Sequence, residues 1–392
     1  MIAIDKPFIS DFLLKSIEEF DLPVIRTEVA SNMIGDHPIH WISEEDARNR
    51  LRSNPLEKVY TNSENSIGWL EQNAKSTRFP KQIQWFKNKV KFRELMSDSF
   101  PDYFFRGVSF EELRGLDLEP LIFPLVVKPA VGFFSIGVHR IEHPREWDQT
   151  ITLIESEVEK WRGTYPREVI NTSDFILEQC IEGEEYAVDC YFDQQGKPVI
   201  LNIFHHLFSS GKDVSDRVYC TSEQIINTYH RGIQEFLEMV GNKTKLVNFP
   251  AHVELRIDSS GQINPIEVNP LRFGGWCTTG DLSWFAYGIN SYDYFFNSKS
   301  PHWKEIFKSR KGKTYSVVVL DNNSGYNESK IKCFMYDKLL KDFEKPMDLR
   351  KVDFRTYAVF GFLFAETSVG NEGELTRILT SNLREYIKLK GA

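Results

Sequence analysis

The stretch HVELRIDSSGQINPIEVN, residues 252–269, decides the fold. Apolar and polar residues alternate in HVELRID and again in INPIEVN, and a Ser-Gly pair separates them, so the stretch predicts a β-hairpin. If the loop between the strands has an even number of residues, positions whose numbers add up to an odd value lie on one face. Glu254 and Glu267 are then cross-strand neighbours, and Asn269 lies two residues further along the same face.

Two carboxylates that face each other repel and destabilise a hairpin unless a cation lies between them. Two carboxylates and one amide oxygen suit Mg²⁺, with Mn²⁺ as an alternative, because Mg²⁺ takes oxygen ligands and usually binds the phosphates of a substrate as well. The competing interpretation is a solvated hairpin face that carries ordinary acidic residues. On this segment alone the two interpretations of Glu254, Glu267 and Asn269 are equally open.

A second stretch, VVKPAVGFFSIGV at residues 126–138, predicts two strands joined by a glycine-containing turn. It contains neither GxxxxGK[ST] nor GxGxxG, so a P-loop and a dinucleotide-binding turn have no support. Backbone N–H groups of such a turn can still bind a phosphate, and Lys128 at the end of the first strand is within reach of the same anion. Alone, the stretch is explained more simply as a hairpin whose lysine extends to solvent.

A third stretch, DFILEQCIEGEEYAVDCYFD at residues 174–193, predicts two strands with a sharp turn at Gly183. Glu184 and Glu185 open the second strand, and carboxylates just past a strand end can accept hydrogen bonds from ribose hydroxyls. Exposed backbone at the end of the first strand can contact the edge of an adenine. An acidic, solvated turn is the alternative.

In this order and spacing, the three stretches resemble the ATP-grasp superfamily of carboxylate–amine ligases over roughly residues 85–280. Glu254 and Glu267-Val268-Asn269 match the superfamily's magnesium pattern, VKPAVGFFSIGV matches its Lys-Pro strand and phosphate loop, and the segment from Glu178 to Glu185 matches its adenine hinge and ribose acid. Three motifs in register are much more specific than one. The resemblance implies an ATP-grasp fold that binds ATP and Mg²⁺.

The resemblance also implies roles for single residues. Lys128 would contact the α- and β-phosphates, the loop from Gly132 to Gly137 would contact the β- and γ-phosphates, and Glu178 and Ile181 would bracket the adenine. Glu185 would hold the ribose, and a second cation would come from Arg93, with Lys89 as the alternative. The nucleotide-binding residues implied in this way are Arg93, Lys128, Gly132, Phe134, Ser135, Gly137, Glu178, Ile181 and Glu185.

On the substrate side the resemblance is looser. Many members of the superfamily have Asn-Pro-Arg after the second acid, whereas this chain has Asn269-Pro270-Leu271-Arg272, so Arg272 would reach the substrate phosphate from a shifted register. In the polar loop SSGKDVSDR, Lys212 and Arg217 lie near a position where related ligases have a phosphate-contacting lysine. The expected catalytic residues are therefore Arg272, Lys212 and Arg217.

The composition restricts the function further. The chain has 392 residues, of which 41% are hydrophobic and 27% charged, and its formal net charge of −8 repels phosphate backbones at long range. Nucleic acid is therefore not an expected partner. No apolar run is long enough for a membrane span, the start lacks the features of a signal peptide, and five cysteines without CxxC spacing indicate reduced thiols. We expect a cytoplasmic protein without a membrane partner.

The periodicity indicates an α/β and α+β chain in three parts. We expect a short N-terminal α/β domain at residues 1–85, an ATP-grasp domain at 86–300 and a C-terminal α/β extension at 301–392. Within the ATP-grasp domain, the nucleotide lobe would cover about 115–182 and the metal lobe about 183–300. The spacing also predicts one helix at 82–97 and a last helix that buries Leu375, Ile378 and Leu383 on one face.

The reaction implied by the resemblance is ATP-dependent ligation. A substrate carboxylate attacks the γ-phosphorus, which gives an acyl phosphate and ADP, and an amine then displaces phosphate to form an amide. Small-molecule carboxylates and amines are the expected partners, and a homodimer is compatible with the sequence. The alternatives are an ATP-binding module of the same fold without turnover and a bicarbonate-dependent enzyme similar to biotin carboxylase.

Overall fold

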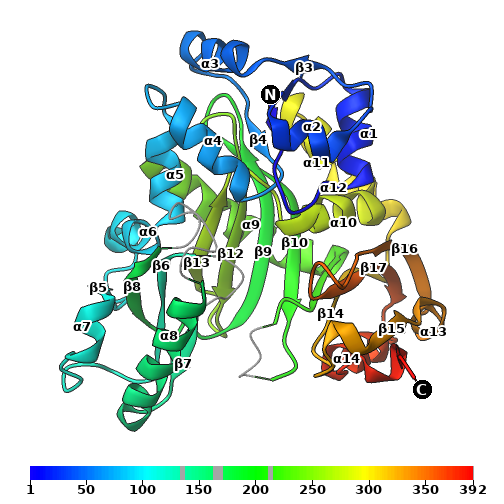
Figure 1. The fold of residues 1–392 in the computed structure, drawn as a ribbon. Helices are drawn as coiled ribbons and strands as arrows, with labels where there is room; N and C mark the ends of the chain where they lie inside the picture. Colours follow the sequence, from blue (N-terminus) through cyan, green and yellow to red (C-terminus); the bar gives the residue numbers. More distant parts are fainter. Residues whose placement is uncertain (133–136, 162–170, 211–214, 392) are drawn as a thin grey trace.

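The computed structural model describes residues 1–132, 137–161, 171–210 and 215–391. Figure 1 shows the N-terminal unit at the top, a small sheet at the lower left, and a long sheet that extends from the centre to the right. In these residues no helix is both long and apolar enough to cross a membrane.

The N-terminal unit is a small parallel sheet with strand order β3-β2-β1-β4, which confirms α/β structure at the start of the chain. Its helices α1, α2 and α3 begin at side-chain caps, since the hydroxyls of Ser10, Thr27 and Ser43 accept backbone N–H groups of the first helical turns. The elements are β1 (Ile2–Ala3), α1 (Asp11–Glu19), β2 (Val24–Ile25), α2 (Glu28–Ile34), β3 (Trp41–Ile42), α3 (Glu44–Ser53), β4 (Tyr60–Thr61) and α4 (Asn65–Asn73).

The small sheet is antiparallel, with order β5-β8-β6-β7, and has an apolar core of its own around Trp147, Phe175 and Leu177. A separate core is what allows this lobe to be a distinct unit. Two helices, α5 (Phe79–Lys87) and α6 (Lys89–Met96), precede it, and its own elements are β5 (Phe105–Ser109), α7 (Phe110–Arg114), β6 (Leu125–Val131), β7 (His139–Ile141), α8 (Trp147–Trp161) and β8 (Asn171–Gln179).

In the described residues the long sheet has eight strands in the order β13-β12-β9-β10-β11-β14-β17-β16. Its first part is β9 (Glu184–Phe192), β10 (Pro198–Leu207), β11 (Val218–Ser222), β12 (Phe249–Ile257) and β13 (Ile263–Pro270), with the helices α9 (Glu223–Thr244), α10 (Thr278–Tyr287), α11 (Ser291–Phe296) and α12 (Trp303–Ile306). Helix α9 packs against β10, β11 and β13, and its apolar face is buried there.

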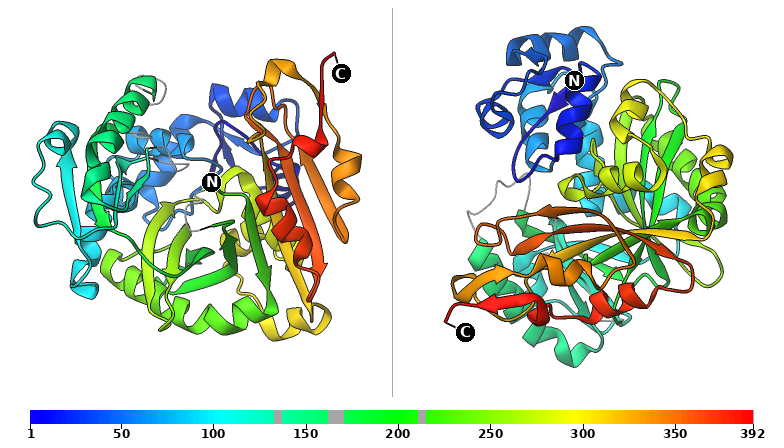
Figure 2. Two further views of the ribbon diagram at one scale, coloured as in Figure 1. Left: turned by 90° about the horizontal axis from the view of Figure 1, so that it is seen from below. Right: turned by 90° about the vertical axis from the view of Figure 1, so that its right-hand side faces the viewer.

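The C-terminal residues continue this sheet, because β14 (Lys313–Asp321) pairs with β11 and then with β17 (Val359–Ser368), which pairs with β16 (Lys345–Lys351). Both views of Figure 2 show this segment alongside the central strands. The remaining elements are β15 (Ile331–Phe334), α13 (Tyr336–Leu340), α14 (Gly373–Thr380) and β18 (Ile387–Leu389). The extension is thus joined to the ATP-grasp region by strand pairing, and the division at about residue 300 stays a prediction.

Two predicted helices differ from the structure. The single helix expected at 82–97 is wrong, because Asn88 adopts an extended backbone conformation between α5 and α6 and its side chain caps α6 by accepting the Lys91 N–H. The last helix ends at Thr380 rather than including Leu383, which has a left-handed backbone with φ of 60° and is nevertheless buried. In both places a local backbone turn interrupts a continuous apolar pattern.

Candidate functional site

The two predicted metal carboxylates face one another. Glu254 of β12 pairs directly with Glu267 of β13, and His252 pairs with Asn269. Asn269 Nδ2 donates to Glu254 Oε1 at 3.1 Å and to Glu267 Oε1 at 3.3 Å, so the three side chains converge at one point. The predicted cross-strand pairing is confirmed.

The pairing was predicted from a loop with an even number of residues, and that assumption is wrong. The loop at residues 258–262 has five residues, an odd number, and near the loop Leu255 pairs with Pro265. A bulge at Ile266 then shifts the register by one residue and restores the opposition of Glu254 and Glu267. The bulge is a feature that alternation of residue types does not reveal.

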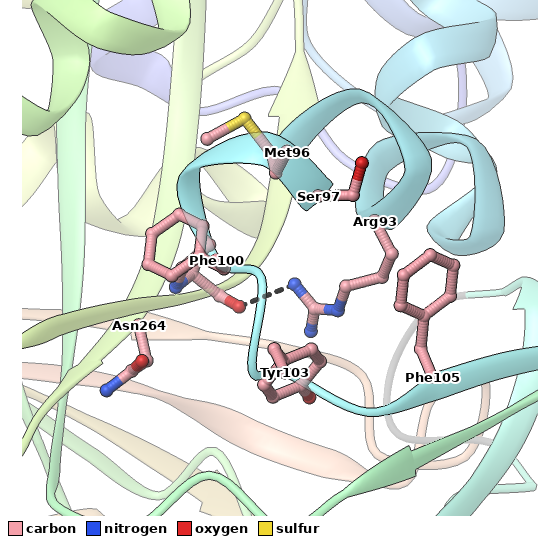
Figure 3. A pocket seen from close by; sticks show the side chains of 8 residues that line it. Arg93, Met96, Ser97, Phe100, Tyr103, Phe105 and Asn264 are labelled. Atoms are coloured by element: carbon pink, nitrogen blue, oxygen red, sulfur yellow. Dashed lines mark hydrogen bonds between the residues drawn. The ribbon is translucent and has the colours of Figure 1, made fainter.

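Arg93 of α6 holds the bulge in place. Its Nη1 donates to the carbonyl oxygen of Pro265 at 2.7 Å and its Nη2 to that of Ile266 at 3.2 Å, while its Nε donates to Glu178 at 2.8 Å. Figure 3 shows Arg93 beside a small cavity of about 10 Å³, which has room for at most one water molecule. All three guanidinium nitrogens therefore have protein partners, and a nucleotide contact by Arg93 stays a prediction.

Glu178 lies at the centre of a buried cluster of ion pairs. Its carboxylate, on β8, forms ion pairs with Arg93 and with Lys128 of β6, and all three side chains are almost fully buried. Burial alone would raise the pKa of Glu178, but the two cations outweigh it and lower that pKa to about 2. Burial lowers the pKa of Lys128, although Glu178 opposes this effect. Lys128 is thus already paired with a carboxylate, and its contact with a phosphate stays a prediction.

The glycine turn after β6 is close to Lys89. Gly137 has φ of +71° and a side chain there would press on the ring of Pro129, so the position suits glycine for two reasons. Lys89 Nζ donates to the Gly132 carbonyl at 3.2 Å and forms an ion pair with Glu267 at 2.9 Å. Lys89, which was the alternative to Arg93, is therefore the cation that the structure brings to this turn. Phe134 and Ser135 lie outside the described residues.

The predicted ribose and adenine residues lie where β8 leads into β9. Glu185 forms ion pairs with His206 at 2.9 Å and with Arg256 at 3.1 Å, and Arg256 also donates to the Ile181 carbonyl at 2.8 Å. Burial raises the pKa of Glu185, but its hydrogen bond with His206 and the charge of Arg256 outweigh this effect, so the pKa is lowered. Arg256 thus ties Glu185 to Ile181, and their nucleotide contacts stay predictions.

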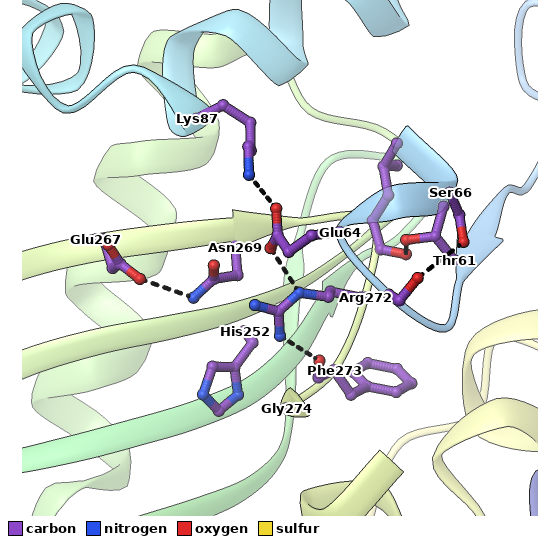
Figure 4. Close-up of polar contacts among 12 residues, drawn as sticks. Thr61, Glu64, Ser66, Lys87, His252, Glu267, Asn269, Arg272, Phe273 and Gly274 are labelled. Atoms are coloured by element: carbon purple, nitrogen blue, oxygen red, sulfur yellow. Dashed lines mark hydrogen bonds and ion pairs between the residues drawn. The ribbon is translucent and has the colours of Figure 1, made fainter. Parts of the chain in front are cut away.

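Arg272 lies near Glu267 and Asn269, as Figure 4 shows. Its Nε donates to Glu64 at 2.8 Å and its Nη1 to the Phe273 carbonyl at 2.9 Å, while Glu64 also pairs with Lys87. Leu271, the extra residue in the motif, has φ of +61°, and its carbonyl accepts from Thr61 N at 2.7 Å. The N-terminal unit therefore fixes the kink that sets the direction of Arg272.

Arg217, another of the expected catalytic residues, is not brought to this point. Arg217 is buried with its guanidinium against Asp321 of β14 at 2.7 Å and against the Ile378 carbonyl at 3.1 Å, so it ties the C-terminal extension to the sheet. Oδ1 of the adjacent residue Asp216 lies 4.0 Å from Nε2 of His206. Lys212 lies outside the described residues.

The residues present fit Mg²⁺ by their chemistry. Within the described ranges no group of three or more His, Cys, Asp or Glu side chains is arranged as a metal site, and the predicted site has two carboxylates and an amide instead. Asn269 presents its NH₂ group to both carboxylates. Rotation of this amide would present three oxygens, a hard ligand set that suits Mg²⁺ together with water and phosphate.

Three contacts were missed by the sequence. Glu64 beside Arg272, Lys89 beside Glu267, and Asp189 beside His252 join segments that are far apart in the chain. His252 Nδ1 lies 2.7 Å from Asp189 Oδ1, and His252 lies on the metal strand two residues before Glu254. The alternation of β12 could have placed His252 on the face of Glu254, but nothing in the sequence pairs it with Asp189.

Comparisons with known proteins indicate the fold. Residues 121–280 match the family model of the ATP-grasp domain. Among solved structures, the L-amino acid ligase from Bacillus licheniformis is similar over 99% of this chain and 97% of its own, with a TM-score of 0.71 and 18% identity. N5-carboxyaminoimidazole ribonucleotide synthetase from Thermotoga maritima gives 0.63 at 14% identity, over 99% of this chain and 98% of its own.

Biotin carboxylase from Campylobacter jejuni is similar over 99% of this chain and 91% of its own, with a TM-score of 0.62 and 11% identity. No curated protein sequence matches the chain significantly. At such low identities the likeness concerns the fold.

Proposed function

We propose that this chain, which has the ATP-grasp fold and carries an ATP-grasp domain at residues 121–280, is an ATP-dependent carboxylate–amine ligase. It would activate a substrate carboxylate as an acyl phosphate, join the acyl group to an amine, and release ADP and phosphate. The observation that carries the proposal is the direct opposition of Glu254 and Glu267, with Asn269 between them and Lys89 at one side.

The charges of the site suit phosphoryl transfer. Lys89 of α6 contacts the Gly132 carbonyl in the phosphate turn, and Lys128 lies on β6, the strand that leads into that turn. Each lysine would be held by a carboxylate, Glu267 or Glu178, until a phosphate replaces it. Glu185 and the Ile181 backbone would bind the ribose and adenine. Glu254, Glu267 and Asn269 would hold Mg²⁺, which when bound neutralises charge on the transferring phosphoryl group. Catalysis then rests on positioning and electrostatics, without a protein nucleophile.

Arg272 would act on the substrate side. The negative charges of Glu64, Glu254 and Glu267 raise the pKa of the Arg272 guanidinium, although burial opposes them. A cation at this place can stabilise the anionic carboxylate and the acyl phosphate. A direct contact between Arg272 and the substrate is part of the proposal.

Two alternatives within the same fold remain candidates. The expected metal ligands Glu254, Glu267 and Asn269 are all present, which favours an enzyme with turnover over a module that only binds ATP. Similarity to a biotin carboxylase keeps a bicarbonate-dependent reaction open. The five cysteines are free thiols, which suits the reducing cytoplasm that we propose as the location. A homodimer stays a prediction.

The test is a coupled assay of ADP and phosphate release. Purified protein with MgATP is screened against amino acids, small peptides and organic acids, singly and in pairs, and against bicarbonate. Release that requires both a carboxylic acid and an amine supports the ligase. Release that requires bicarbonate supports the carboxylase alternative, and nucleotide binding without release under any condition contradicts the proposal.

A further inference from the structure

A buried pair behind the candidate metal group has no role in the reaction described so far. Asp189 of β9 is fully buried, and its Oδ1 accepts from His252 Nδ1 at 2.7 Å and from the Gly274 backbone N–H at 3.2 Å. An ionised carboxylate is an acceptor only, so this contact places the proton of His252 on Nδ1 and fixes the orientation of the ring.

The other ring nitrogen faces the candidate metal ligands. His252 Nε2 is 3.7 Å from Glu254 Oε1, which is too long for a hydrogen bond, and among the residues that the structure describes it has no hydrogen-bond partner. His252 as a whole residue is only 5% exposed. When the ring carries its proton on Nδ1, its Nε2 can accept a hydrogen bond.

The strand register supplies that donor. His252 pairs with Asp189 on one side and with Asn269 on the other, so the three residues form one row across β9, β12 and β13. Glu254 and Glu267 form the next row. Figure 4 shows the His252 ring below Asn269 and on the side of the strands where Glu267 and Arg272 also lie.

Cation binding requires Asn269 to turn. At present its Nδ2 donates to both carboxylates, which is the wrong polarity for a site that is to contain a cation. When the amide rotates, Oδ1 takes the place of Nδ2 and the NH₂ group needs a new acceptor, because an unpaired buried donor is costly.

We propose that His252, held by Asp189, is a positioning residue for the cation site: its Nε2 accepts the Nδ2–H of Asn269 when the Asn269 oxygen turns to a divalent cation. The inference rests on the proposed function and deepens it. Partners of this kind around metal ligands typically account for 10- to 100-fold in metal affinity.

The test measures Mn²⁺ affinity by electron paramagnetic resonance in the presence of a non-hydrolysable ATP analogue. His252→Asn keeps a donor near Asp189 but removes the acceptor at the Nε2 position, so we expect affinity to fall about 10- to 100-fold. His252→Gln places an amide oxygen near the Nε2 position and should restore affinity to within a few-fold of wild type. His205→Asn is the matched control, since His205 pairs with Glu184 at 2.9 Å outside this row and its loss should leave affinity unchanged.

A second measurement separates positioning from a general structural role. In an Asn269→Asp background no NH₂ group needs an acceptor, so His252→Asn should no longer change Mn²⁺ affinity; an equal loss in both backgrounds would overturn the proposal. Wild-type affinity in His252→Asn would overturn it as well, while leaving the proposed function intact. If the wild-type protein binds no Mn²⁺ with the analogue, the proposed function fails and this inference fails with it.

Discussion

Replacing each of the two opposed carboxylates by its amide should give opposite effects on stability and the same effect on activity. Glu267 forms an ion pair with Lys89, and this pair lowers the pKa of Glu267 although burial opposes it. Among the described residues no lysine or arginine forms an ion pair with Glu254, and burial together with the charge of Glu267 raises its pKa well above the usual range. The folded protein therefore favours a charge at Glu267 and disfavours one at Glu254.

The size of the effect follows from burial. Breaking one partner of a buried ion pair costs about 3–5 kcal/mol, because the remaining charge is left without compensation. Lys89 is 10% exposed and Glu267 is 20% exposed, so water relieves part of this cost. We expect Glu267→Gln to lower the free energy of unfolding by about 2–3 kcal/mol. Glu254→Gln removes a like-charge repulsion and should change stability by less than about 1 kcal/mol, in the stabilising direction.

The assay combines urea denaturation of the nucleotide-free variants with ADP release at saturating and at limiting Mg²⁺. Both variants lose a ligand charge of the proposed cation site, so both should lose most of the Mg²⁺-dependent turnover while they remain folded. A destabilisation by Glu254→Gln as large as that by Glu267→Gln would refute the assignment of charges. Wild-type turnover of Glu267→Gln at limiting Mg²⁺ would refute the proposed mechanism.

Four further predictions follow from the same geometry. Saturating MgATP should raise the melting temperature, because a ligand that binds only the folded state stabilises it; an unmoved melting curve would contradict the nucleotide site. Lys128→Ala should weaken nucleotide binding in calorimetry, whereas Lys197→Ala in a surface turn, with the same change in net charge, should not.

Glu178→Gln should destabilise by on the order of 3 kcal/mol at neutral pH, since its pKa falls from 4.5 to about 2; the difference from wild type should shrink as the pH falls from 4.5 through 2, and a pH-independent difference in denaturation would contradict it. Lys89→Met should bind ATP less tightly but bind Mn²⁺ without nucleotide more tightly than wild type, because Glu267 is then released; equal Mn²⁺ affinities would contradict this exchange.

The sequence could predict the parts of the fold that depend on local patterns. Alternation in β12 and β13 predicted that Glu254, Glu267 and Asn269 share one face, but that argument assumed an even-numbered loop, and the bulge at Ile266 is what restores the register. Three motifs in order were sufficient for the fold. What local patterns could not show are the backbone interruptions, such as the bulge at Ile266 and the break at Asn88, because a bulge or a cap changes the register without changing which residues are apolar.

The sequence also could not predict which distant segments pair with each other. Arg93 reaches the Pro265 carbonyl across 172 positions, and β11 pairs with β14 so that Val218 faces Val318. Strand patterns show that a strand is buried, but they do not name its partner. Arg217 illustrates the consequence, since a cation near a polar loop has the residue type of a phosphate contact, yet the added strand β14 supplies Asp321 as its partner.

The ion pairs around the site indicate how nucleotide and metal binding depend on each other. Lys89 holds Glu267 in the nucleotide-free protein, so the carboxylate that is to bind a cation is already neutralised by a lysine. A triphosphate attracts Lys89 more strongly than one carboxylate does, because it carries more negative charge. In the proposed function, movement of Lys89 to the phosphate would release Glu267 to bind a cation, and by reciprocity a bound cation would favour the nucleotide. Lys89 would then be the residue through which each ligand increases the affinity for the other.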